Sequence, residues 1–236
     1  MIKYTEHHHI IDSTMNLAER YIKEQKYDDH FLIIADEQTN ARGRKENKWL
    51  SDIGCLWFNL VLSHISRQKS FTSFIGVCIL KTLLELTDNH SFKIKWPNDI
   101  YLFDKKIGGL ICTQFTKYKK TSIGIGINTN NEKPLLETAD SIRNTLTKNI
   151  NNYIYLHKII HSVFDNLSIF EESGITIFSD IIKEHDYLHK KQIKVITGNN
   201  TYQGQYIGLN NDGELLLLDN QNIVNTIYSG SVTIVK

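Results

Sequence analysis

The chain has 236 residues, of which 41% are hydrophobic and 22% are charged, and its formal net charge at pH 7 is +1. This composition is typical of an ordinary globular protein, and the length allows one large core or a main domain with a small appendage. A net charge so close to zero gives no overall attraction to nucleic acid or to an anionic membrane, so neither partner is expected.

The cysteines and the apolar runs indicate a cytoplasmic protein. Cys55, Cys78 and Cys112 are isolated and lie in apolar runs, which is typical of reduced core residues rather than of disulfides or a metal site. No apolar run reaches the roughly 20 residues that span a bilayer. The first residues also lack the apolar stretch of a signal peptide.

Hydrophobic spacing predicts helices and strands up to residue 188. The histidines at 7–9 are interpreted as the polar start of a first strand, and Ser13 or Thr14 caps a helix over 14–23. Continuous apolar runs indicate buried strands, and apolar residues three or four apart indicate helices. The next expected elements are strands over 31–35 and 56–62, a helix over 71–86, strands over 92–96, 100–103, 107–115 and 122–128, a loop over 130–137, and helices over 151–170 and 175–188.

After residue 188 short β-type runs alternate with turn clusters. Asp212-Gly213 between apolar runs is a strong hairpin signal. The expected strands lie over 192–197, 202–209, 214–218, 223–228 and 232–235. The fold class is therefore predicted as α+β, with a mixed β-sheet domain and packed helices over 1–188 and a small β-barrel domain over 189–236.

A basic, glycine-centred loop follows the strand at 31–35. Arg42, Arg44 and Lys45 surround Gly43. Arginine supplies fork-shaped donors that match phosphate, and glycine lets backbone N–H groups come close to an anion. The loop is not a P-loop, because neither Gly-Lys-Ser/Thr nor a helical pattern follows it. We interpret it as the binding site of a small anion, with a solvated turn and a nucleic-acid patch as alternatives.

Two polar motifs stand at the ends of predicted elements. Ser13 and Thr14 lie at a helix N-terminus, where plain capping is the alternative to ligand binding. Lys95 ends a half-buried strand just before a proline, and it either neutralises an anion or lies along the surface as most lone lysines do. Asn98 and Asp99 either contact a nucleotide or metal or merely form the turn.

Glycines also occur inside two predicted strands, in Lys106-Ile-Gly-Gly-Leu110 and Gly124-Ile-Gly-Ile-Asn128. Glycine destabilises a strand, so it usually marks the close approach of a ligand or another backbone, and a bulge is the alternative.

In this order the motifs resemble those of the biotin protein ligases, or biotin–[acetyl-CoA-carboxylase] ligases. The resemblance covers essentially the whole chain and implies a class II synthetase-like main domain, as in the biotin and lipoate ligases, with an SH3-like C-terminal β-barrel. Only about a dozen residues precede Asp12, too few for a DNA-binding domain, so a monofunctional ligase is expected. The residues that carry the resemblance are Asp12-Ser-Thr14, Gln38, Arg42-Gly-Arg44, Trp49, Lys95-Trp-Pro-Asn-Asp99, Lys106-Ile-Gly-Gly-Leu110, Gly124-Ile-Gly-Ile-Asn128 and Ala139-Asp-Ser-Ile142.

The resemblance implies an ATP-dependent enzyme that makes biotinyl-5′-AMP and pyrophosphate from biotin and MgATP. It then transfers biotin to a lysine of a biotin carboxyl carrier protein or carboxylase acceptor domain, as a monomer or a homodimer. Lys95 and Arg44 are implied to be catalytic, and no ligands of Mg²⁺ are assigned. The implied biotin-binding residues are Ser13, Thr14, Gln38, Arg42, Gly43, Arg44, Lys95, Gly108, Gly109, Gly124 and Gly126. The implied nucleotide-binding residues are Arg42, Arg44, Trp49, Asn98 and Asn128.

The chain departs from the usual family pattern at three positions. Ala41 and Glu46 replace the outer glycines of a loop that commonly reads Gly-Arg-Gly-Arg-Arg-Gly, and this loop is expected to act as a lid. Met15 stands where the family often has a small polar residue, so no side-chain hydrogen bond is assigned to it. A lipoate ligase or octanoyltransferase of the same fold is the nearest alternative, and a nucleic-acid-binding module is a more distant one.

Overall fold

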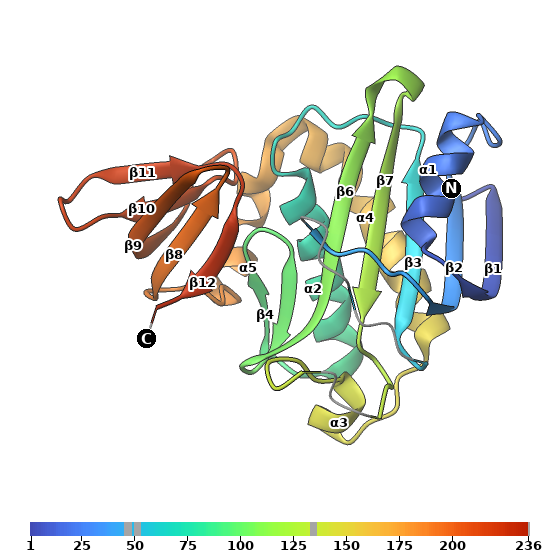
Figure 1. The fold of residues 1–236 in the computed structure, drawn as a ribbon, viewed down its shortest axis with the longest axis horizontal. Coiled ribbons are helices and arrows are strands. Elements are labelled where there is room, and N and C mark those ends of the chain that lie inside the picture. Colours follow the sequence, from blue (N-terminus) through green and yellow to red (C-terminus); the bar gives the residue numbers. More distant parts are fainter. Residues whose placement is uncertain (45–48, 50–52, 133–135, 236) are drawn as a thin grey trace.

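The computed structural model describes residues 1–44, 49, 53–132 and 136–235. Two β-sheets organise this part of the chain (Figure 1). In the seven-stranded sheet, β1 and β2 pair in parallel, whereas the other neighbouring strands pair antiparallel. The prediction of a mixed sheet is therefore confirmed. In spatial order its strands are β1 (Tyr4–Ile11), β2 (Phe31–Gln38), β3 (Leu56–Leu62), β7 (Lys120–Ile127), β6 (Lys105–Phe115), β5 (Asp99–Leu102) and β4 (Phe92–Lys95).

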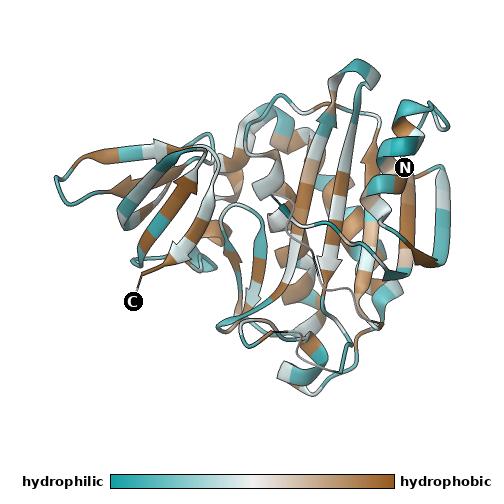
Figure 2. Cartoon of the chain, viewed as in Figure 1, coloured by the Kyte–Doolittle hydropathy of each residue, from teal (hydrophilic) through white to brown (hydrophobic). Residues whose placement is uncertain are grey.

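Helices pack on both faces of this sheet. Helices α2 (Phe71–Thr87) and α4 (Asn152–Ser173) cover one face, and α1 (Thr14–Lys23) lies on the other, over β2 and β3. In β2, Leu32 belongs to the core under α2 and α4, whereas Phe31 and Ile33 pack with α1. Figure 2 shows the resulting runs of hydrophobic residues along the central strands, as expected for strands buried on both faces.

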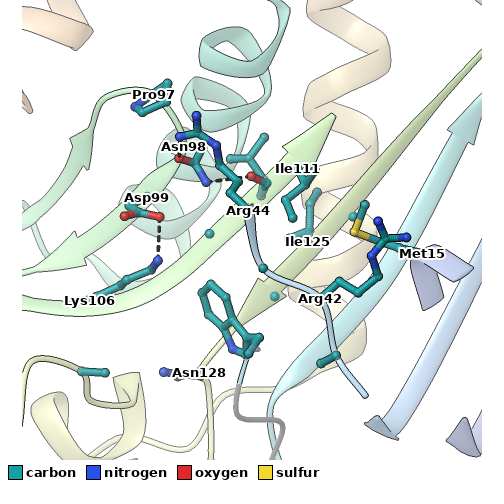
Figure 3. A pocket seen from close by; sticks show the side chains of 18 of the residues that line it. Met15, Arg42, Arg44, Pro97, Asn98, Asp99, Lys106, Ile111, Ile125 and Asn128 are labelled. Carbon is teal, nitrogen blue, oxygen red and sulfur yellow. Dashed lines mark hydrogen bonds and ion pairs between the residues drawn. The ribbon is translucent and has the colours of Figure 1, made fainter. Parts of the chain in front are cut away.

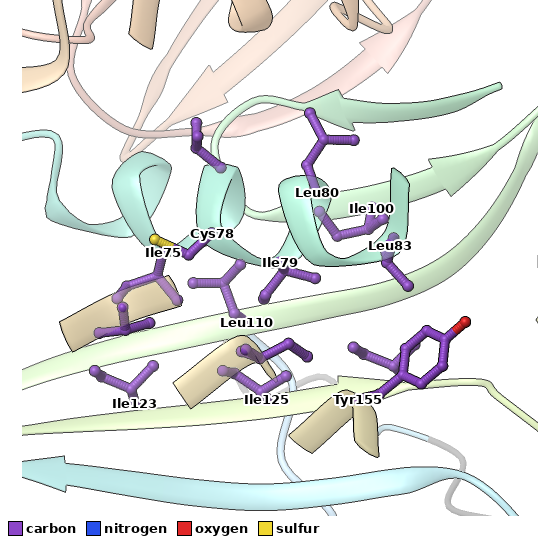
Figure 4. Close-up of a cluster of buried hydrophobic side chains, with 14 of the residues drawn as sticks. Ile75, Cys78, Ile79, Leu80, Leu83, Ile100, Leu110, Ile123, Ile125 and Tyr155 are labelled. Atoms are coloured by element: carbon purple, nitrogen blue, oxygen red, sulfur yellow. The ribbon is translucent and has the colours of Figure 1, made fainter. Parts of the chain in front are cut away.

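The main core lies between α2 and the central strands. Ile75 and Ile79 of α2 pack with Leu110 of β6 and Ile125 of β7 (Figure 4). Each fully buried aliphatic side chain contributes roughly 1.5–3 kcal/mol of transfer free energy. The core therefore fixes β6 and β7 from one side, which leaves their glycine-rich side available for a site.

Two of the three cysteines, Cys55 and Cys78, are buried as predicted, and Cys112 is half-buried. Cys55, Cys78 and Cys112 are free thiols. Cys78 lies in the main core (Figure 4), and burial raises the pKa of its thiol to about 12. Such a group stays protonated near neutral pH and behaves as a small apolar side chain.

The second sheet is C-terminal and antiparallel throughout. Its core includes Trp96, Tyr187 and Leu188 as well as residues of its own strands. A five-stranded antiparallel sheet fits the predicted SH3-like domain, and the boundary at residues 188 and 189 stays a prediction. In spatial order the strands are β11 (Val224–Ile227), β10 (Leu215–Leu218), β9 (Asn200–Leu209), β8 (Gln192–Thr197) and β12 (Ser231–Ile234).

The predicted helix over 175–188 is helical only as far as residue 184, and its last residues are not helical. A 3₁₀ helix, η3 (Gly174–Phe178), is followed by the short helix α5 (Ser179–Glu184). The next residues run along β4: the Ile94 N–H donates to the His185 carbonyl at 2.8 Å, and the Tyr187 N–H donates to the Ile94 carbonyl at 2.9 Å. These hydrogen bonds satisfy the outer edge of β4, and such tertiary pairing outweighs local helical spacing.

The histidines at 7–9 lie inside β1 rather than at its start. His7 and His9 point to the same side, where their ring nitrogens lie 2.7 and 2.8 Å from the carboxylate of Asp36 on β2. This carboxylate comes from a strand that is distant in sequence, so the spacing of the histidines alone could not reveal it.

The remaining helices are short. The 3₁₀ helix η2 (Thr116–Tyr118) follows β6, and α3 (Ile142–Leu146) begins after Ser141, whose hydroxyl accepts a hydrogen bond from the Asn144 N–H. In the described ranges, no helix has both the length and the apolar character needed to cross a bilayer.

Candidate active site

A cavity of about 330 Å³ lies on the side of the main sheet that carries Gly109 of β6 and Gly124 and Gly126 of β7. The β1–α1 turn, the end of β2, the basic loop, the β4–β5 turn and the C-terminal sheet all contribute to its wall. Every predicted site residue except Gly108 lines it. Those brought together are Ser13, Thr14, Gln38, Arg42, Gly43, Arg44, Trp49, Lys95, Asn98, Gly109, Gly124, Gly126 and Asn128.

The β1–α1 turn and the end of β2 form one polar corner of the cavity. Ser13 is the N-cap of α1, and its hydroxyl accepts a hydrogen bond from the Met15 N–H at 3.2 Å. Gln38 Oε1 accepts hydrogen bonds from the Thr14 N–H at 2.8 Å and from the Thr14 hydroxyl at 3.1 Å. Because its oxygen is held twice, the Gln38 amide has a fixed orientation. The capping role and the ligand role are therefore compatible in this turn.

The two arginines of the basic loop extend to different sides of the cavity (Figure 3). Arg42 donates to Asn16 of α1 at 3.1 Å and lies 3.6 Å from the Glu19 carboxylate. Arg44 donates to the Asn98 side-chain oxygen at 2.8 Å, and the Asn98 amide donates in turn to the Leu110 carbonyl at 3.0 Å. These two hydrogen bonds, from Arg44 to Asn98 and from Asn98 to the backbone of β6, fix the direction of the guanidinium. Lys45 and Glu46 lie outside the described residues.

Burial makes the cations on this wall receptive to an anion. It lowers the pKa of Arg44 from its ordinary value, although the charge of Asp99 opposes the shift. Burial also lowers the pKa of Lys95. The Lys95 ammonium lies 5.5 Å from the centre of the Tyr101 ring. A desolvated cation gains more from a bound phosphate or carboxylate than an exposed one does.

Lys106 is a cavity residue that the sequence interpretation did not assign. Its ammonium lies 2.7 Å from the Asp99 carboxylate and 4.5 Å from the centre of the Trp49 ring. The pairing of β5 with β6 shifts register between Ile100 and Tyr101, so Lys106 faces Tyr101, whereas Gly109 faces Asp99. This irregularity turns Lys106 toward the cavity, against simple alternation along the strand.

Gly108 points away from the cavity because successive residues of a strand face opposite sides, and its neighbour Gly109 faces the cavity. Gly108 pairs with Ile100, which belongs to the main core. A Cβ at Gly108 would lie 3.0 Å from the Gly126 carbonyl oxygen and 3.4 Å from Ile127. Gly108 therefore allows tight packing between β6 and β7, and the structure does not bring it to the cavity.

The other strand glycines lie beneath large side chains of the cavity wall. A Cβ at Gly109 would lie 3.0 Å from the Trp49 ring. A Cβ at Gly126 would overlap the indole of Trp57, the residue opposite it on β3. Trp57 was missed in the sequence, because its position opposite a glycine depends on the pairing of two strands distant in sequence. These two glycines thus make room for protein side chains.

Asn128 and the residues after it close another side of the cavity. Asn128 is only 3% exposed, and its side-chain amide donates to the Asp140 carbonyl at 3.2 Å. Its backbone N–H donates to the Ile107 carbonyl at 2.7 Å. These bonds hold the segment that contains Ala139, which lines the cavity, so Asn128 has a supporting role whether or not it binds nucleotide.

The C-terminal sheet reaches the same cavity, which the sequence did not predict. Gly230, Ser231 and Val232 line it. Trp96, whose indole N–H donates to the Gly213 carbonyl at 3.0 Å, belongs to the core of that sheet. The motif that carries Lys95 therefore also anchors the second sheet.

Four cations, Arg42, Arg44, Lys95 and Lys106, line the cavity, and Asp99 supplies the one carboxylate among the described residues there. The fold and this charge balance define an α+β protein with a cavity whose charge suits a small anionic ligand beside an oriented amide. Residues 8–130 match the Biotin/lipoate A/B protein ligase family, and the chain belongs to this family.

Individual relatives agree with this assignment. The chain is 26% identical to biotin–protein ligase 2 of Arabidopsis thaliana over 218 residues, which cover 84% of the chain and 64% of that protein. It is 27% identical to the bifunctional ligase/repressor BirA of Bacillus subtilis, over 96% of the chain and 72% of that protein. The structure of the Aquifex aeolicus biotin protein ligase in complex with biotin and ATP covers 100% of both chains, with a TM-score of 0.86 and 27% identity.

Proposed function

We propose that this protein is an ATP-dependent biotin protein ligase. It activates biotin as biotinyl-5′-AMP and transfers the biotinyl group to a lysine of an acceptor protein. The observation that carries the proposal is the excess of cations over carboxylates in a cavity that also holds the oriented Gln38 amide. The biotin and ATP bound to the Aquifex relative, which matches the whole chain, support this choice of ligands.

In the first step the biotin carboxylate attacks the α-phosphorus of ATP and displaces pyrophosphate. Both reactants are anions, so the site must neutralise them while it holds them in line. Arg44, oriented by Asn98, and Lys95, on a half-buried strand, serve this purpose and stabilise the charge that develops on the phosphoryl oxygens. Arg42 and Gly43 contact the biotinyl-5′-AMP that forms, from the other side of the loop.

The polar corner receives the head of biotin. The ureido group of biotin has N–H donors and a carbonyl acceptor, which match the hydroxyls of Ser13 and Thr14 and the amide of Gln38. The nucleotide then lies toward Trp49, Asn98 and Asn128. This arrangement places the biotin carboxylate between the two halves, near Lys95 and Arg44.

Magnesium belongs to the MgATP substrate in this proposal. The described residues contain no group of three or more His, Cys, Asp or Glu side chains that could hold a metal by themselves. Mg²⁺ is commonly held by one or two carboxylates together with the substrate phosphates. Asp99 fits such a part, because its carboxylate lies in the cavity wall beside Lys106.

In the second step the acceptor lysine attacks the mixed anhydride and releases AMP. The attacking amine comes from the partner, so no nucleophile of this chain is needed. The partner is a biotin carboxyl carrier protein or a carboxylase acceptor domain that acts with the ligase in the cytoplasm. Either a monomer or a homodimer is compatible with this chemistry.

The test is acceptor labelling. The purified protein is mixed with MgATP and a biotin-acceptor domain, with either biotin or lipoate as the acid. The proposal predicts acceptor labelling and pyrophosphate release with biotin. If lipoate supports both and biotin supports neither, the protein is a lipoate ligase instead.

A further inference from the structure

Met15 packs against Gly124 at the polar corner of the cavity. A Cβ at Gly124 would lie 2.7 Å from Cγ and 2.9 Å from Sδ of Met15. Both separations are far below van der Waals contact, so no side chain at position 124 is compatible with the present position of Met15. Met15 itself is half-buried and lines the cavity, where Figure 3 shows it beside Ile125 and Arg42.

The space over Gly124 lies on β7, between the neighbouring strands β3 and β6. Gly124 lies opposite Asn59 on β3 and opposite Ile111 on β6. The Asn59 side chain is fully buried and exchanges hydrogen bonds with the Ser122 hydroxyl at 2.9 and 3.1 Å. Met15 fills this space, and its unbranched thioether adapts to such an irregular gap.

The backbone of Met15 is fixed where the polar corner begins. Its N–H donates to Ser13, and the residue before it makes both hydrogen bonds to Gln38. A change in the Met15 side chain therefore alters the shape of this corner without moving its donors and acceptors.

We propose that Met15 forms the apolar wall of the acid-binding end of the cavity, and that Gly124 makes room for Met15 rather than for the ligand. The inference rests on the proposed function, and it identifies the apolar wall against which the ring system of biotin packs. Its physical content is a steric coupling between positions 15 and 124, and a double-mutant cycle measures such a coupling.

The cycle compares the wild type with Met15→Ala, Gly124→Ala and the double variant, with the dissociation constants of biotin and MgATP measured by calorimetry. Gly124→Ala is expected to weaken biotin binding at least about tenfold, because the new methyl pushes Met15 into the cavity. Met15→Ala is expected to weaken it only about threefold, through lost packing. In the Met15→Ala background, Gly124→Ala should then weaken biotin binding by less than about twofold, because the clash is gone. MgATP binding should stay within about twofold throughout.

Each outcome separates this inference from the proposed function. A wild type that binds no biotin refutes the proposed function itself. If the wild type binds biotin and Gly124→Ala weakens biotin binding by the same factor in the wild type and in Met15→Ala, the glycine makes room for the ligand and the inference is wrong. If Gly124→Ala folds only together with Met15→Ala, the coupling is supported directly. If neither variant that carries Gly124→Ala folds, Met15→Phe decides, because an unchanged biotin affinity there would overturn the role of Met15.

Discussion

At the scale of single residues, Lys106 belongs to a motif in the sequence, but the motif assigns no role to its charge. Its ammonium stands between the Asp99 carboxylate and the face of Trp49, inside a cavity in which cations outnumber carboxylates. An incoming phosphate or carboxylate would compete with Asp99 for this ammonium. Lys106 is therefore expected to act with Arg44 and Lys95 on the anionic reactants.

Lys105 and Lys106 are neighbours and provide a matched pair of variants. Lys106→Ala is expected to lower kcat/KM for biotinyl-5′-AMP formation by about 100-fold, because one charge that stabilises the reacting anions is lost. Lys105 is exposed and does not line the cavity, so Lys105→Ala should keep the wild-type rate. Equal effects of the two substitutions on the rate of pyrophosphate release would contradict the role of Lys106.

The contrast between predicted and unpredicted residues has a physical basis. Arg42, Arg44 and Lys95 could be identified in the sequence, because their charges stand beside glycine or proline at the ends of apolar runs. Lys106 could not be placed, because a register shift between β5 and β6 turns it toward the cavity. Gly108 was grouped with Gly109 by the motif, although neighbouring residues of a strand face opposite sides. Met15 stood out in the sequence only as a departure from the usual family pattern, since its packing depends on a glycine that reaches it only through the folding of the sheet.

At the scale of elements, Glu6 ties β1 to α1 and to the turn that follows the helix. Its carboxylate accepts hydrogen bonds from Tyr21 at 2.9 Å, Lys26 at 2.8 Å and Tyr27 at 2.5 Å. Burial alone would raise the pKa of Glu6, but these hydrogen bonds outweigh it and lower the pKa from 4.5 to about 2. The β1–α1 turn with Ser13 and Thr14 lies between the elements that Glu6 joins.

Stability should therefore depend on the ionisation of Glu6. Because the pKa is lower in the folded state, this contribution is present above pH 4.5 and is lost as the pH falls toward 2. Glu6→Gln is expected to cost on the order of 2 kcal/mol at pH 7 and less at pH 3, as measured by urea unfolding. Glu24→Gln, at an exposed position, serves as the control. A Glu6→Gln penalty that does not shrink between pH 7 and pH 3 would refute this role.

The elements themselves could largely be predicted from local sequence. The strand over 56–62 and the helix over 14–23 have the predicted bounds, because both depend on the periodicity of their own residues. The helix over 175–188 failed where its last residues pair with the edge of β4. Order within the sheet was also beyond local patterns, since β3 lies beside β7 rather than beside β4.

At the scale of the whole molecule, Trp96 anchors the two sheets to each other. Trp96 follows β4 of the main sheet, is 5% exposed, and packs in the core of the C-terminal sheet. Lys69, which precedes α2, adds ion pairs to Asp212 at 3.0 Å and Glu214 at 3.3 Å. Since Lys95 adjoins Trp96 and Val232 lines the cavity, the packing of the two sheets also determines the shape of the site.

This coupling predicts the effect of Trp96→Phe. The variant removes the indole N–H and leaves the Gly213 carbonyl without that donor, which should cost about 1–2 kcal/mol of unfolding free energy. Because the sheets share a core residue, wild type and variant should each unfold in one calorimetric transition. Tyr228→Phe, at a residue 75% exposed, should leave the melting temperature unchanged. Two separate transitions in the wild type would show that the sheets are independent.

The cation-rich cavity is expected to join biotin to AMP, and formation of the adenylate without an acceptor tests this most directly. The protein is incubated with MgATP labelled at the α-phosphate and with either biotin or lipoate, and the products are separated. The expected product is a labelled biotinyl-5′-AMP that appears with biotin and is nearly abolished by Arg44→Ala in a variant that remains folded. A labelled adduct that forms with lipoate alone, or that forms equally well in the Arg44→Ala variant, would contradict this role of the cavity.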